Sequence, residues 1–220
     1  EDVEELRALR EAGVEDLPGE EEVRGGAVKP FSALEHHARG FKRLGILRMD
    51  VDNMGRIVSE GLGGRASLAR LAGLSFMINL YFEGACAGLA RACNRGGSKN
   101  RGGFDRVYSI YSGGDDLFFA GAWDAMPGLA LDICEGLRQF TGGHPGIHLS
   151  GGIALVGGKY PLYQAAEDGE AALDESKARQ GKNSLTFLGQ SLDWVTFKDA
   201  LAEKEQLAGL VSAEELPRQI

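Results

Sequence analysis

The feature that most constrains the fold is a glycine pair followed by two acids, Ser112-Gly113-Gly114-Asp115-Asp116, set between two apolar runs. The runs are rich in β-branched and aromatic residues, and glycines supply the positive φ angles that tight hairpin turns need. We therefore predict a β-hairpin with strands at about 106–112 and 115–121. The second strand begins with two carboxylates and continues as Leu-Phe-Phe-Ala, which places negative charge at the mouth of a core. A turn with solvated acids is the plain alternative.

A second predicted strand, at about 44–52, also ends in acids. Because successive side chains of a strand alternate between faces, Leu47, Met49 and Val51 point to one face, which suits a core under helices. An unpaired charge is costly to bury, so an acid near the middle of this strand indicates a function. The opposite face is expected to be open and carries Ile46, Arg48, Asp50 and Asp52.

These two acidic segments together predict a metal site. If the first strand lies beside the hairpin, then Asp50, Asp115 and Asp116 converge on one spot. Three carboxylates repel one another unless a cation lies among them, and hard divalent cations such as Mg²⁺ or Mn²⁺ prefer oxygen ligands.

The hydrophobic periodicity extends the pattern into an order of elements. We predict helices over about 67–92, 124–140 and 161–179, a strand over 148–155 and a short strand over 184–187. With the first strand and the hairpin, the order is β-α-β-β-α-β plus an added helix and strand, which is the ferredoxin-like α+β pattern. In that pattern the first strand is central, helices cover one face of the sheet, and the other face is free.

Some details of the helices are also predicted. Asp124 is expected to cap the second helix, and Leu68 and Phe140 are expected to face the core. Residues 94–103, which contain no apolar side chain, are expected to form a loop.

The composition is that of an ordinary globular protein, with 43% hydrophobic and 25% charged residues among 220. No apolar run approaches the roughly 18 residues of a membrane span, so we expect a cytoplasmic protein without a membrane anchor. The three cysteines lack a CxxC spacing and are expected to be reduced core thiols. The net charge of −8 argues against a sequence-independent grip on nucleic acid by this segment, but not against nucleotide binding through metal ions.

With these positions assigned, the chain resembles the GGDD-bearing palm domain of the large subunit of type III CRISPR effector complexes, the Csm-type polymerase/cyclase subunit. The resemblance covers roughly residues 41–190. It is carried by five motifs, which are LRMDVDNMG at 47–55, YSGGDDLF at 111–118, LSGGIA at 149–154, KYPLY at 159–163 and GKNS at 181–184.

The resemblance implies an activity, partners and a site. Such subunits convert ATP into cyclic oligoadenylate second messengers when the complex binds target RNA, using two divalent ions to activate the 3′-hydroxyl and stabilise the leaving oxygens. It implies as partners a second palm domain and, through the complex, the other effector subunits, crRNA and target RNA. The implied metal ligands are Asp50, the main-chain carbonyl of Val51, Asp115 and Asp116. The implied nucleotide-binding residues are Ser112, Gly113, Gly114, Asn53, Lys177 and Lys182.

The resemblance also suggests three parts of the chain. We expect residues 1–40 to be a lead-in from something upstream, 41–190 to be the GGDD palm domain, and 191–220 to be a helical extension. Because the first residue is Glu1, we expect the chain to be a piece of a longer one.

Several alternatives stay open. The chain could be a GGDEF-class diguanylate cyclase, or a non-catalytic palm that acts as a scaffold in a ribonucleoprotein. Lys177 could bind phosphate or complement a helix C-terminus. Asp52 could be a metal ligand or a partner of Arg48, and Asn53 could contact a nucleotide or cap the following turn.

Overall fold

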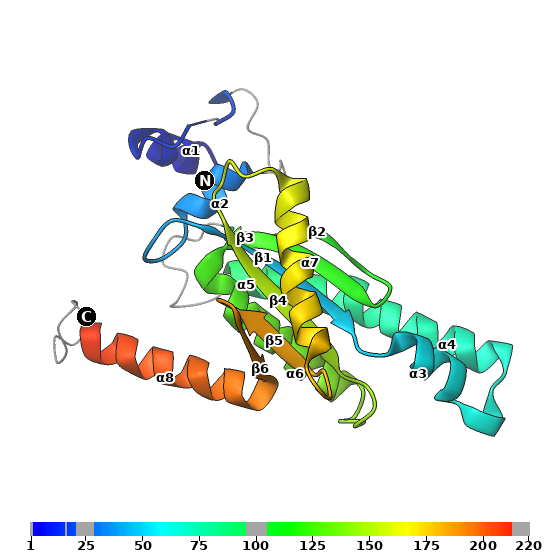
Figure 1. The fold of residues 1–220 in the computed structure, drawn as a ribbon. Helices are drawn as coiled ribbons and strands as arrows, with labels where there is room; N and C mark the ends of the chain where they lie inside the picture. Colours follow the sequence, from blue (N-terminus) through cyan, green and yellow to red (C-terminus); the bar gives the residue numbers. More distant parts are fainter. Residues whose placement is uncertain (1, 16, 21–28, 96–104, 213–220) are drawn as a thin grey trace.

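A mixed six-stranded sheet organises the chain, in the order β2-β3-β1-β4-β5-β6. The computed structural model describes residues 2–15, 17–20, 29–95 and 105–212 (Figure 1). All neighbouring strands are antiparallel except β4 and β5. The strands are β1 Leu44–Val51, β2 Val107–Gly113, β3 Asp116–Ala122, β4 Leu149–Val156, β5 Ser184–Phe187 and β6 Gln190–Asp193.

The helices include one long rod of three consecutive segments, in which the π-helical segment η3 joins α4 to α5. None of the described helices is both long and apolar enough to cross a membrane. The rod is formed by α4 Leu68–Leu80, η3 Tyr81–Cys86 and α5 Ala87–Arg95. The other α-helices are α1 Asp2–Glu11, α2 Phe31–His36, α3 Met54–Glu60, α6 Met126–Phe140, α7 Leu162–Ala178 and α8 Trp194–Ser212. Two short 3₁₀ turns are η2 Gly63–Arg65 and η4 Trp123–Ala125.

The predicted order β-α-β-β-α-β and the central position of the first strand are confirmed. The predicted alternation along β1 is confirmed as well, since Leu47, Met49 and Val51 all belong to the main core. That core lies between the sheet and the rod, α6 and the start of α8. Cys86 is buried within it, and burial raises the pKa of its thiol to about 12, as expected of a reduced core cysteine.

The prediction that the other face of the sheet is free was wrong. A second core cluster covers part of it, and contains Leu34 of α2, Ile46 of β1 and Ala165 of α7. Figure 1 shows α7 crossing this face, on the opposite side of the sheet from α6. Gly152 in β4 allows α7 to approach closely, so this helix can bring polar side chains to the end of β1.

Other differences have local causes. Asp124 lies inside η4 and caps nothing, because its carboxylate accepts from both the Arg106 guanidinium at 2.5 Å and the Arg39 backbone N–H at 3.0 Å. Leu68 is 85% exposed at the first turn of α4, and Phe140 is 40% exposed at the last turn of α6. Both residues lie at helix ends, beyond the part of the helix that packs on the sheet.

Three elements were not predicted, and part of one prediction lies outside the described chain. Helix α2 lies in the expected lead-in, helix α3 occupies what was expected to be a connection, and β6 occupies the start of the expected C-terminal helix. The β5–β6 turn uses Leu188 and Gly189, both at positive φ, which suits a two-residue hairpin. Of the predicted loop at 94–103, residues 96–103 lie outside the described residues.

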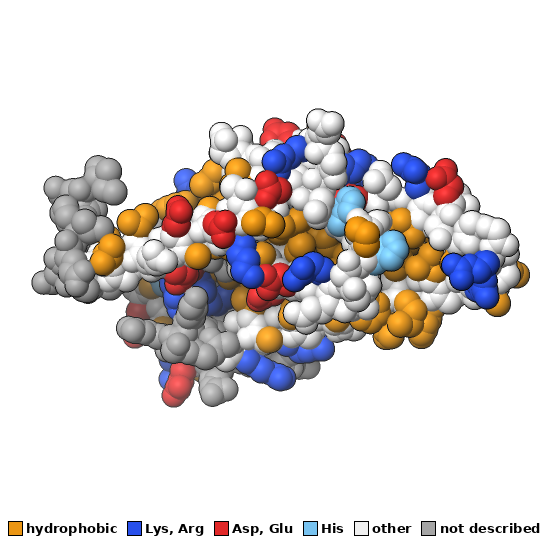
Figure 2. Space-filling model, turned by 90° about the horizontal axis from the view of Figure 1, so that it is seen from below, with side chains coloured by type: hydrophobic (Ala, Val, Ile, Leu, Met, Phe, Trp, Pro, Cys, Tyr) orange, Lys and Arg blue, Asp and Glu red, His pale blue; other side chains and the backbone are white. Residues whose placement is uncertain are grey.

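The surface carries both signs of charge. On the face shown in Figure 2, acidic and basic side chains lie next to one another among hydrophobic ones. Among the described residues of that face, no single-sign patch suggests a nucleic-acid grip.

The close contact between β4 and α7 gives a first prediction. A Cβ added at Gly152 would lie 2.2 Å from the backbone nitrogen of Leu173 in α7, so Gly152→Ala should lower the free energy of unfolding by about 1–3 kcal/mol or more. Gly128→Ala is the matched control, because Gly128 is an exposed position of α6 with nothing within 4 Å of the added carbon. It should be neutral or stabilising by about 0.5–1 kcal/mol. Urea unfolding of both variants measures this, and equal stabilities would contradict the proposed packing.

Candidate active site

The predicted adjacency of Asp50 and the hairpin acids is confirmed by the register of the sheet. Asp50 is the next-to-last residue of β1 and lies opposite Asp116, the first residue of β3. The Val51 N–H donates to the Asp115 carbonyl oxygen at 2.9 Å, which holds the hairpin turn against the end of β1. The three carboxylates therefore extend from neighbouring points at one end of the sheet.

Lys177 supplies the positive charge at this point. It lies in the last turn of α7, and its ammonium is 2.8 Å from Asp50 Oδ2. Burial raises the pKa of Asp50, and the negative charges of Asp115 and Asp116 raise it further, while the ion pair with Lys177 opposes the rise. The site therefore holds more negative charge than one ammonium fully compensates.

The tip of the hairpin is fastened to the rod behind it. The Gly114 N–H donates to Asn79 Oδ1 of α4 at 2.7 Å, and the Ser112 hydroxyl donates to the Phe82 carbonyl oxygen of η3 at 2.5 Å. Gly114 has a φ of 64°, the left-handed geometry for which the glycine was predicted. Ser112 and Gly114 thus direct their donors into the protein, while Gly113 lies against the Glu83 side chain of η3.

Aromatic and basic groups surround the acids from the β2 side. The Tyr111 hydroxyl donates to Asp116 Oδ2, and burial together with this acidic partner raises the pKa of Tyr111. The Arg48 guanidinium lies over the Phe118 ring and pairs with Glu170 of α7 at 2.7 Å. The alternative that Arg48 pairs with Asp52 was therefore wrong.

Lys182 and Asn53 are brought together although they are far apart in the sequence. The Lys182 ammonium donates to Asn53 Oδ1 at 3.0 Å. Asn53 precedes α3 with a left-handed φ of 57° and makes no side-chain capping hydrogen bond, so the capping alternative was wrong. This pair and the Lys177–Asp50 pair both form at the end of β1, which gives the site two ammonium groups.

Asp52 has partners that the sequence did not reveal. Its carboxylate is fully buried and accepts from His148, Ser150 and the backbone N–H of Asn183. These partners come from the start of β4 and from the turn before β5.

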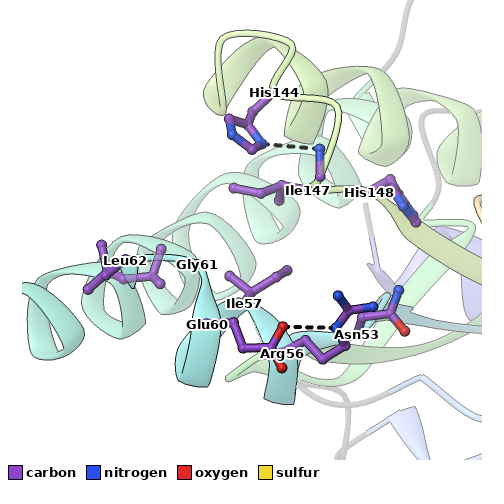
Figure 3. A pocket seen from close by; sticks show the side chains of 11 residues that line it. Asn53, Arg56, Ile57, Glu60, Gly61, Leu62, His144, Ile147 and His148 are labelled. Carbon is purple, nitrogen blue, oxygen red and sulfur yellow. Dashed lines mark hydrogen bonds and ion pairs between the residues drawn. The ribbon is translucent and has the colours of Figure 1, made fainter. Parts of the chain in front are cut away.

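A pocket of about 410 Å³ opens beside Asn53. In Figure 3, Ile57 of α3 faces Ile147 of the loop before β4 across this pocket, with Asn53 and His148 at one end. The pocket is missing from the sequence prediction because α3 was not foreseen, and α3 forms one of its walls.

The metal site itself stays a prediction. Within the described ranges, no three His, Cys, Asp or Glu side chains are grouped as a ready-made metal centre. The donor chemistry nevertheless fits a hard divalent cation, since Asp50, Asp115 and Asp116 offer carboxylate oxygens and the pKa of Asp50 is raised partly by the other two. The acids are close enough to repel one another electrostatically, and a cation would relieve this repulsion.

Comparison with known proteins identifies the family. The model of the Cas10/Cmr2 second palm domain matches residues 43–186. The Cas10/Csm1 single-strand-specific deoxyribonuclease (subtype III-A) of Methanocaldococcus jannaschii is 34% identical over 167 residues, which is 70% of this chain and 21% of that protein. Its namesake from Mycobacterium tuberculosis is 34% identical over 164 residues, 71% of this chain and 20% of that protein. The chain thus spans about a fifth of these curated relatives.

Solved structures agree with this result. A Csm1–Csm4 cassette in complex with one ATP is 26% identical with a TM-score of 0.68, covering 80% of this chain and 26% of that one. Csm1 of T. onnurineus is 25% identical with a TM-score of 0.67, covering 80% of this chain and 27% of that one. The family match spans most of the sheet and both acidic segments, and the solved relatives share the fold. The chain therefore belongs to the Cas10/Cmr2 family and carries its second palm domain.

Proposed function

We propose that this palm binds ATP with two divalent ions and condenses it into cyclic oligoadenylates as part of an RNA-activated type III CRISPR effector. The observation that carries the proposal is the placement of Asp50 opposite Asp116, with Lys177 and Lys182 beside them. The relatives solved with ATP and with AMPPNP support ATP as the substrate. The cyclic product is inferred from the family resemblance.

The residues have distinct roles in this proposal. Asp50, Asp115, Asp116 and the Val51 carbonyl would hold the ions, which when bound supply Lewis acidity to the attacking hydroxyl and the leaving oxygens. Lys177 compensates Asp50 in the free protein, and it would be released to contact phosphate if a cation were bound to that carboxylate. Lys182 neutralises the β- and γ-phosphates. The 3′-hydroxyl of one ATP loses its proton to water, its oxygen forms a bond to the α-phosphorus of another ATP, and the bond to pyrophosphate breaks.

The ligand roles of the hairpin residues are more restricted. The Ser112 and Gly114 donors are engaged with η3 and α4, so we infer that they shape the turn and that their contacts to a nucleotide would require these bonds to open. Gly113, which has no side chain, lets the hairpin pass close to Glu83 of η3.

The partners follow from the family. The solved relatives pair Csm1 with Csm4, including a subcomplex of the type III-A Csm interference complex. We infer a Csm4-like subunit, crRNA and target RNA as partners of the assembly, and a second palm that presents the second nucleotide. The deoxyribonuclease activity in the names of the curated relatives belongs to proteins about five times as long as the stretch they share with this chain.

The double variant Asp115→Asn with Asp116→Asn should abolish Mg²⁺-dependent ATP binding and condensation while the fold is retained. The reason is that both changes remove anionic oxygen ligands without changing side-chain shape. Asp50→Ala should be equally damaging, and combining it with the double variant should add no further loss, because all three acids hold the same ions. Calorimetry with ATP and Mg²⁺, or with EDTA, measures this against Asp199→Asn, an exposed aspartate on α8. Wild-type binding by the double variant would refute the assignment.

Asp50→Asn should raise the thermal stability of the metal-free protein at pH 7. A carboxyl whose pKa is raised on folding makes the folded state less stable once it ionises, so its contribution falls as the pH rises through that pKa. The gain should therefore shrink as the pH approaches 3.8, the ordinary Asp value. Melting curves from pH 3.5 to 8 test this, again with Asp199→Asn as control. A gain that does not change with pH, or a loss at pH 7, would contradict it.

Turnover of ATP per chain should fall on dilution, because the second nucleotide must come from a second palm and proximity then drives the reaction. GTP should not be turned over, on the strength of the family resemblance. A dilution series with each nucleotide, with products separated by chromatography, measures both. Comparable turnover of GTP to a cyclic dinucleotide would favour a diguanylate cyclase, and binding of ATP without any turnover at high concentration would favour a scaffold.

A further inference from the structure

Asp52 is a buried charge next to the proposed metal ligands, yet it belongs to a different network. Its side chain is 0% exposed. Three donors converge on its Oδ2 atom, from His148 Nδ1 at 2.7 Å, the Ser150 hydroxyl at 3.0 Å and the Asn183 backbone N–H at 2.9 Å. Its Oδ1 atom is buried without a hydrogen-bond partner among the described residues. Burying a carboxylate costs free energy unless hydrogen bonds compensate it. Three donors on one oxygen therefore indicate that this carboxylate has a specific role.

This carboxylate joins three segments. From the end of β1, the carboxylate of Asp52 contacts the start of β4 and the turn before β5. The backbone N–H of Asp52 also donates to the His148 carbonyl oxygen at 2.9 Å. The turn holds three consecutive residues at positive φ, which are Gly181 at 86°, Lys182 at 51° and Asn183 at 48°. Glycine and asparagine adopt this region readily, so the cost of about 1–2 kcal/mol falls mainly on Lys182, and outside support favours the turn. The Asn183–Asp52 hydrogen bond provides it.

The supported turn places Lys182. The residue after Lys182 is fixed by the Asp52 carboxylate, and the Lys182 ammonium contacts Asn53, the residue after Asp52. Asp52 thus constrains Lys182 in two ways. Its carboxylate fixes the backbone next to Lys182, and the residue after Asp52, Asn53, accepts the hydrogen bond of the Lys182 side chain. His148, which contacts the same carboxylate, lines the pocket together with Asn53.

We propose that Asp52 is a positioning residue for nucleotide binding. Its carboxylate contacts no nucleotide, and it fixes the strained 181–183 turn so that the Lys182 ammonium is placed for the terminal phosphates. This inference rests on the proposed function. It assigns to Asp52 neither of the two roles open from the sequence, metal ligand or partner of Arg48.

The test compares ATP with AMP, since only ATP carries the phosphates that Lys182 would contact. Asp52→Asn keeps the shape of the side chain but removes its charge, which weakens all three hydrogen bonds. In the 220-residue chain with Mg²⁺, this variant should bind ATP about tenfold more weakly and AMP as tightly as the wild type, the scale of one charge-assisted hydrogen bond. Lys182→Ala should show the same pattern. The double variant should lose no more ATP affinity than Lys182→Ala alone.

A purely structural role predicts something different. Equal losses of ATP and AMP affinity, or additive losses in the double variant, would overturn the proposal. If circular dichroism shows that Asp52→Asn is unfolded, Ser150→Ala tests the proposal instead, because it removes one donor from the same Asp52 oxygen. This variant should lose less affinity than Asp52→Asn is expected to lose, and only for ATP. Thr196→Ala is the matched control, since it removes a hydroxyl–carboxylate contact between Thr196 of α8 and Asp193 at the end of β6, and it should leave both affinities unchanged. A wild-type chain that does not prefer ATP over AMP would instead refute the proposed function.

Discussion

The burial of Asp50 beside two further acids at the end of β1 is the constraint on which the rest of the site depends. The antiparallel pairing of β1 with β3 forces Asp50 and Asp116 opposite each other, and the hairpin turn adds Asp115. A partly buried carboxylate is costly without a positive partner, so the fold must supply one. It does so with Lys177 from α7. Helix α7 must therefore lie across β1 and β4, and Gly152 of β4 makes that close approach possible.

The acidic hairpin is braced on its far side by neutral groups. Asn79 and the Phe82 carbonyl oxygen hold the turn through hydrogen bonds that do not change the local charge. This arrangement separates two tasks. The rod fixes the position of the hairpin carboxylates. Helix α7 and the 181–183 turn supply the positive charge near them, through Lys177 and Lys182. Substitutions in the rod should then alter geometry, and substitutions on the α7 side should alter electrostatics.

The sequence predicted the parts of the site that depend on local patterns. Alternation along β1 and the glycine turn were enough to place Asp50 beside Asp115 and Asp116, and the motif order was enough for the family. Contacts between distant segments were not predictable in this way. The pairing of Lys177 with Asp50 depends on how α7 crosses the sheet, and the partners of Asp52 come from residues almost 100 and about 130 positions later. Asp124 was predicted to cap a helix because aspartate is a common N-cap residue. Its actual partner, Arg106, is brought to it only by the three-dimensional fold.

The π-helical segment η3 links the shape of the rod to the hairpin. A π turn takes one residue more than an α turn for about the same rotation. Here the carbonyl of Phe82, inside that segment, is the acceptor for Ser112. Deleting a single residue from η3 and restoring regular α geometry would therefore leave α4 and α5 in nearly the same relative orientation. Asn79 would still face Gly114, but the main chain around Phe82 would change its path, and Ser112 would lose its acceptor. The extra residue of the rod thus serves the acidic hairpin rather than the helix itself.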